Sequence, residues 1–169
     1  MSKSKTPLSR VWFAGHGFLK VPPESIGGKT LYVDRTGKFV NEYGQELKPS
    51  IFAIDAKRRP NCHGRYPCMP SYGGRTCHAL VWETFVGPRT KGLQIDHLNG
   101  NKRDWSLDNL EEVTQKENMK RAKILRCLRE AGTDPCTIPY ARLKQIFASY
   151  ELIDPKKLME RDLHEHREY

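Results

Sequence analysis

Three polar residues near the middle of the chain have the types and order of a metal site with an adjoining base. Asp96 and His97 are neighbours, and Asn118 follows after an intervening polar loop. Aspartate and asparagine both offer oxygen, which suits Mg²⁺, an ion that keeps several waters and also binds substrate phosphate. Histidine titrates near neutrality and can accept a proton at working pH. The pattern indicates Asp96 and Asn118 as metal ligands and His97 as a base.

Two strands and a helix must bring these residues together. Leu93–His97 and Leu110–Val113 predict short strands on either side of the polar loop 98–109. Thr114-Gln-Lys-Glu117 has the form of a capping box. The helix that it opens ends near Gly132 and keeps one apolar face, made of Met119, Ala122, Leu125 and Leu128. Antiparallel strands can present their loop end beside a following helix, so Asp96 and Asn118 can approach one cation while His97 points to the other face.

The flanking segments predict further short elements. Residues 29–48 alternate polar and apolar types around Gly37 and Gly44, which predicts a β-meander. Residues 57–75 are basic and rich in proline, which favours an irregular loop, and residues 1–10 predict a loose arm. Cys77–Val86 has helical spacing, with a strand as the alternative for so short a run. Pro139–Tyr150 and Pro155–His166 predict two C-terminal helices.

Charge and hydropathy restrict the classes of partner. The net charge is +9, and residues 1–126 carry 22 Lys and Arg against 12 Asp and Glu. This excess fits a polyanion, although ordinary solubilising charge explains it about equally well. Apolar runs are too short to span a bilayer, and residues 1–7 do not lead into the apolar core of a signal peptide. We expect a cytoplasmic protein without a membrane partner.

Several motifs together resemble the HNH endonucleases of the phage homing-endonuclease type. They are Ile95-Asp-His-Leu-Asn-Gly-Asn-Lys102, Asp108-Asn-Leu110 and Val113-Thr-Gln-Lys-Glu-Asn118. Cys77-His-Ala-Leu-Val-Trp-Glu-Thr-Phe85 is similar to the segment that usually precedes them in that family. The meander around residues 33–40 resembles a small DNA-contacting module often found N-terminal to the nuclease.

This resemblance implies an α+β fold with a ββα-metal core, an N-terminal β-meander and C-terminal helices. The implied divisions are an N-terminal arm (1–28), a β-rich DNA-contacting module (29–75), the nuclease core (76–131) and a helical tail (132–169). Asp96 and Asn118 would bind one Mg²⁺ (or Mn²⁺), His97 would deprotonate the attacking water, and Asn109 would brace the loop. The implied function is an endonuclease acting on double-stranded DNA in a bacterial or phage-infected cell. The competing hypotheses are a non-cleaving DNA-binding protein and, more remotely, a zinc-ribbon-like module.

Basic residues around the motifs are the predicted DNA contacts, with a solvated surface as the alternative. They are Lys57, Arg58, Arg59, Lys102, Arg103, Lys120, Arg121 and Lys123. His78 is interpreted as a core histidine that hydrogen-bonds a backbone carbonyl, with direct catalysis as the alternative. Cys62, His63, Cys68 and Cys77 lack the tight spacing expected of structural zinc, and an odd count of five cysteines favours reduced thiols. One site per chain makes one nick, so a double-strand cut needs a homodimer or two events by a monomer.

Overall fold

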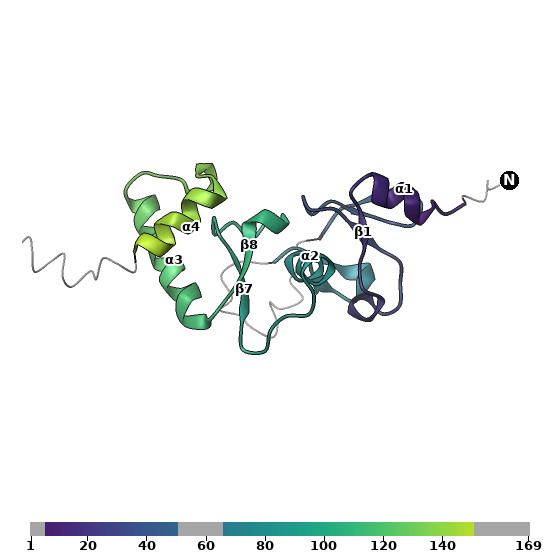
Figure 1. Ribbon diagram of the computed structural model, residues 1–169, viewed down its shortest axis with the longest axis horizontal. Helices are drawn as coiled ribbons and strands as arrows, with labels where there is room; N and C mark the ends of the chain where they lie inside the picture. Colours follow the sequence, from purple (N-terminus) through teal and green to yellow (C-terminus); the bar gives the residue numbers. More distant parts are fainter. Residues whose placement is uncertain (1–5, 51–65, 151–169) are drawn as a thin grey trace, which may run out of the picture.

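A computed structural model describes residues 6–50 and 66–150 of the chain. Its elements follow one another along the long axis (Figure 1). The meander and α1 (Arg10–Gly15) lie at one end, α2 (Cys77–Phe85) in the middle, and α3 (Gln115–Glu130) with α4 (Tyr140–Ser149) at the other end. The strands form one four-stranded sheet and two two-stranded pairs. This mixture of helices and small sheets agrees with the predicted α+β class.

The predicted meander is present and gains a fourth strand. β2 (Tyr32–Val33), β3 (Phe39–Val40) and β4 (Glu46–Leu47) pair antiparallel in chain order. Gly37 and Gly44 occupy the turns with φ of +85° and +73°, a conformation that favours glycine. β1 (Leu19–Lys20) pairs with β2 at the other edge.

The N-terminal segment is folded onto the meander rather than extended as an arm. Ser9 caps α1, because its hydroxyl accepts a hydrogen bond from the Trp12 amide at 3.2 Å. Phe13, 1 % exposed, stacks on Tyr32 with ring centroids 3.7 Å apart. Side chains on both sides of the predicted boundary at residue 28 therefore pack together, because Leu8, Phe13 and Phe18 form one cluster with Tyr32 and Val40. The sequence prediction missed this because Gly15 and Gly17 interrupt the apolar pattern.

The central region leads from a hairpin into the predicted helix. β5 (Cys68–Met69) and β6 (Arg75–Thr76) pair around the 3₁₀ turn Pro70–Tyr72, so the end of the predicted irregular loop is regular. Helix α2 follows at once and ends before Gly87, whose φ is +120°. Its Leu80 and Val81 are buried in the main core with β7 and β8 residues. The helical reading of residues 77–86 is confirmed.

Two antiparallel strands and a helix then follow in immediate succession. β7 (Gln94–His97) pairs with β8 (Leu110–Val113), which places Asp96 opposite Glu111. Thr114 caps α3 by accepting from the Glu117 amide at 3.2 Å. The reciprocal half of the predicted capping box is absent, because the Glu117 carboxylate instead accepts from Arg121 Nε at 2.9 Å.

Helix α4 covers only the later part of α3. Ile124 and Leu125 of α3 are buried against Leu143 and Phe147 of α4, with Leu98 completing this second core. Met119, which the pattern placed on the apolar face, is 67 % exposed because α4 does not reach it. The predicted helix Pro155–His166 lies outside the described residues. Within the described ranges no helix is long and apolar enough to cross a membrane.

Candidate active site

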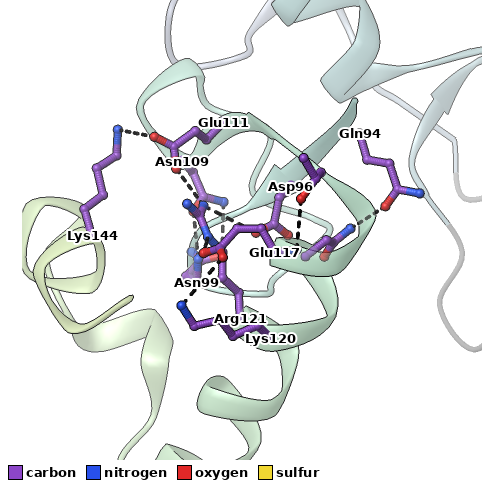
Figure 2. Close-up of polar contacts among 11 residues, drawn as sticks. Gln94, Asp96, Asn99, Asn109, Glu111, Glu117, Lys120, Arg121 and Lys144 are labelled. Carbon is purple, nitrogen blue, oxygen red and sulfur yellow. Dashed lines mark hydrogen bonds and ion pairs between the residues drawn. The ribbon is translucent and has the colours of Figure 1, made fainter. Parts of the chain in front are cut away.

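Asp96 leaves strand β7 on the side that faces α3 (Figure 2). Its Oδ2 atom is buried and has no hydrogen-bond partner among the described residues, and Arg121 Nη1 lies 3.7 Å away. Burial raises the pKa of Asp96 to about 6, while the positive charge of Arg121 acts in the opposite direction. A buried carboxylate oxygen without a donor is a position that a cation can satisfy.

His97 lies on the opposite face of the strand, toward α2. Its ring centroid is 5.2 Å from that of His78 and 6.0 Å from that of Tyr66. Its side chain is 4 % exposed, and Nε2 has no hydrogen-bond partner in the described part of the chain. Burial lowers the pKa of His97 to about 4, so the imidazole is neutral at pH 7 and can accept a proton.

Asn118 reaches the site from the first turn of α3. Its Nδ2 donates to Gln94 Oε1 at 2.8 Å, which holds the amide against β7. An open cavity of about 300 Å³ contains Asp96, His97 and Asn118 in its wall. The strand pair and helix thus bring together the three residues singled out from the sequence.

The donor set of this cavity fits a hard divalent cation such as Mg²⁺. Asp96 provides an oxygen that lacks a hydrogen bond, and Asn118 provides an amide. No group of three or more His, Cys, Asp and Glu with the geometry of a metal cage is present among the described residues. Such a site would rely on water and substrate oxygens for its remaining ligands, as is usual for Mg²⁺.

Asn109 braces the loop between the strands and is fully buried. Its Nδ2 donates to Asn99 Oδ1 at 3.0 Å and to the Asp104 carbonyl at 2.6 Å. Its Oδ1 accepts from the Asn99 amide at 3.1 Å. The side chain of Asn109 therefore closes the loop onto Asn99, which lies two residues beyond the end of β7.

The same loop is joined to the meander and to α4. Trp105 Nε1 donates to the Gly37 carbonyl at 2.7 Å, and a Cβ at Gly37 would collide with the indole. On the other side, Asp104 Oδ2 accepts from Tyr140 Oη at 2.7 Å and from Asn99 Nδ2 at 2.8 Å. Both ends of the molecule thus support the loop that follows His97.

Arg121 is enclosed by carboxylates rather than presented to solvent (Figure 2). Its side chain is 11 % exposed, and its guanidinium lies 2.6 Å from Glu111 and 2.9 Å from Glu117. The guanidinium also lies 4.9 Å from the centre of the Phe147 ring on α4. This geometry makes Arg121 an internal ion-pair residue, which differs from its predicted role as a DNA contact.

The other predicted DNA contacts lie in different places. Lys102 lines the Asp96 cavity with its ammonium 4.5 Å from the centre of the Tyr66 ring, and Arg103 lines a separate cavity beside the meander. Lys120 lies 3.7 Å from Glu117, and Lys123 is exposed on α3. The remaining three, Lys57, Arg58 and Arg59, lie outside the described residues.

The cysteines near the site are internal. Cys68 and Cys77 are buried free thiols, and burial together with the nearby Cys68 raises the pKa of Cys77 well above its ordinary range. Cys62 and His63, the other members of the considered zinc set, lie outside the described residues.

Sequence reasoning missed two neighbours of the site. His78, expected to be a core histidine, contacts His97 edge-on and hydrogen-bonds Thr76 Oγ1 at 3.3 Å. Arg129 lines the same cavity as Asp96. Helical spacing from Asn118 could have identified Arg129, whereas only the tertiary structure brings His78 to His97.

Comparison with known proteins places the segment that carries this site in a defined class. The family profile described as HNH endonuclease matches residues 75–120. This segment therefore belongs to the HNH endonuclease family, and the resemblance read from the motifs is confirmed.

Two particular proteins are similar to the chain. Protein 3.8 of Escherichia phage T7 is 49 % identical over 41 residues, which are 24 % of this chain and about a third (34 %) of that protein. A solved structure described as "DNA binding and cleavage by the HNH homing endonuclease I-HmuI" is 26 % identical, with a TM-score of 0.39. That match covers 72 % of this chain and 63 % of the other.

Proposed function

We propose that this chain is a metal-dependent endonuclease that hydrolyses phosphodiester bonds of double-stranded DNA, with a ββα-metal core formed by β7, β8 and α3. The observation that carries the proposal is the convergence of Asp96, His97 and Asn118 on one cavity. The HNH endonuclease match over residues 75–120 supports the same class of reaction. The proposed setting is the cytoplasm of a bacterial or phage-infected cell.

His97 is the proposed general base. Its neutral imidazole accepts a proton from a water molecule, whose oxygen then attacks the phosphorus in line. The bond between phosphorus and the 3′ oxygen breaks as the new bond forms, which leaves a 3′ hydroxyl once that oxygen is protonated by solvent. The hydrogen bonds of Asn109 hold the loop beside His97 and so keep the ring aimed at the water.

Asp96 and Asn118 are the proposed ligands of one Mg²⁺ or Mn²⁺. When bound, the ion supplies positive charge that stabilises the phosphate and the departing oxygen. Asp96 offers the buried Oδ2, and the contact of Asn118 with Gln94 fixes the amide at the start of α3. The neighbouring Glu111 and Glu117 are held by Arg121, whose Nη1 also lies 3.7 Å from Asp96 Oδ2 without a hydrogen bond to it.

A plasmid-nicking assay tests this function. The full chain is incubated with supercoiled plasmid in Mg²⁺, in Mn²⁺ or in EDTA, beside His97→Ala and the control His16→Ala. His16 is an exposed histidine on the end of α1. We expect nicking in either metal, none in EDTA, and a loss of about 100-fold or more in His97→Ala only, the usual contribution of a general base.

Two results would overturn the proposal. Nicking that persists in EDTA would exclude a metal requirement. Nicking that persists in His97→Ala would exclude His97 as the general base. Binding of DNA without cleavage in either metal would identify a non-cleaving DNA-binding protein instead. The ratio of nicked to linear product also reports whether one chain cuts one strand or a homodimer cuts both.

A further inference from the structure

One face of α3 forms a wall of the cavity that contains Asp96. The residues on this face are Asn118, Ala122, Leu125 and Arg129. Their spacing of four, three and four residues places them on a single stripe of the helix. Arg129 lies eleven residues after Asn118, about 16 Å along the helix axis. The stripe therefore runs from the proposed metal site to a cationic end.

The guanidinium of Arg129 is packed against the loop that follows His97. A Cβ built on Gly100 would lie 2.9 Å from Arg129 Nη2 and 3.0 Å from Leu125 Cδ1. Gly100 has a φ of +71°, and its amide donates to the His97 carbonyl at 2.7 Å. Because helical side chains lean toward the N-terminus, Arg129 reaches back over Gly100 rather than away from the cavity.

The charge of Arg129 is not neutralised within the described part of the chain. Arg121 is enclosed by Glu111 and Glu117, and Arg126 lies 3.9 Å from Glu130, but no described carboxylate forms an ion pair with Arg129. Lys102 lines the same cavity. The cavity that contains the Asp96 carboxylate is therefore also lined by the guanidinium-bearing side chain of Arg129.

We propose that Arg129 binds a non-scissile phosphate of the DNA strand that flanks the phosphate that is cut. A guanidinium presents a planar fork of donors that matches phosphate oxygens in pairs. Its distance from Asn118 along α3 assigns it to a flanking phosphate rather than to the reacting one. This inference rests on the proposed function, because it assumes that DNA occupies the cavity. The purely structural alternative is that Arg129 stabilises the C-terminal end of the α3 dipole.

The salt dependence of DNA binding separates these roles. Fluorescence anisotropy with a labelled duplex is measured from about 50 to 300 mM KCl on full-length His97→Ala protein, which prevents cleavage. The added substitutions are Arg129→Ala, Arg129→Lys and Arg126→Ala. Arg126 is the matched control, because it lies on the same helix and its removal changes the net charge equally.

We expect Arg129→Ala to raise Kd about tenfold and to make the slope of log Kd against log salt shallower by about 0.9, the value for one lost phosphate contact. Arg129→Lys should keep the slope, and Arg126→Ala should leave it unchanged. In the active protein, Arg129→Ala should raise KM and leave kcat unchanged.

An Arg129→Ala slope equal to that of Arg126→Ala would overturn the inference. A lower Tm with an unchanged slope would assign Arg129 to the helix dipole. The proposed function fails separately: a protein that shows the Arg129-dependent slope but never nicks plasmid has the phosphate contact without the catalysis. A protein that nicks plasmid with no Arg129-dependent slope has the catalysis without this contact.

Discussion

Replacing Asn109 with alanine should destabilise the loop that follows His97. The substitution removes the hydrogen bonds of a fully buried side chain to Asn99 and to the Asp104 carbonyl. It leaves the Asn99 amide and the Asp104 carbonyl without their partner. A buried polar group without a partner costs about 1–3 kcal/mol, and water entry reduces the sum for two such groups, so we expect a loss of about 3 kcal/mol.

Urea unfolding followed by tryptophan fluorescence measures this change by linear extrapolation. Asn101→Ala is the matched control from the same loop. Asn101 is half-buried, and its side-chain oxygen accepts from the Arg103 amide at 3.0 Å. Its loss should cost below about 1 kcal/mol, because water can replace the contact.

The nicking rate per folded molecule is the second measurement, and it isolates the positioning role of Asn109. A displacement of His97 by about 1 Å is enough to slow catalysis by about 100-fold. Equal free energies of unfolding for Asn109→Ala and Asn101→Ala would refute the claim that the buried hydrogen bonds of Asn109 stabilise the loop. Full activity in folded Asn109→Ala would refute the claim that these hydrogen bonds aim His97.

Two further predictions concern charged groups near the site. Arg121→Met should lower the free energy of unfolding by about 3 kcal/mol, because Glu111 and Glu117 would then face the buried carboxylate of Asp96 without a cation. The salt dependence of DNA binding should not change. Unchanged stability with a shallower salt slope would restore Arg121 as a DNA contact. Burial raises the pKa of Asp104, but hydrogen bonds from Ser106, Tyr140 and Asn99 outweigh it and hold that pKa below its ordinary 3.8. The ionised form thus contributes stability that is present above the unfolded pKa and is lost as pH falls through the folded pKa. Between about pH 5 and pH 3 the urea midpoint of the natural protein should therefore fall further than that of Asp104→Asn, and parallel curves would contradict this.

Much of the architecture around the site follows from local sequence signals. The alternation around Gly37 and Gly44 predicted the meander, and Thr114 predicted the start of α3 and so the position of Asn118. These features depend on residues close in sequence, whose turn and capping preferences act within one or two turns of chain. The packing of α1 on the meander was not predicted, because it depends on contacts between distant segments.

The sequence by itself determined which residues could bind a metal and accept a proton, because Asp96, His97 and Asn118 are specified by type and spacing. It did not determine which of the nearby cations remain available to DNA. Arg121 and Arg129 lie on one helix, and locally only the spacing of Glu117 four residues before Arg121 separates them, whereas the pairing of Arg121 with Glu111 comes from another element. The packing of α4 places Phe147 over Arg121 among carboxylates, while Arg129 lies along the cavity beside Gly100. Burial and ion pairing depend on segments distant in sequence, so only the tertiary structure decides which charge is used internally and which faces the cavity.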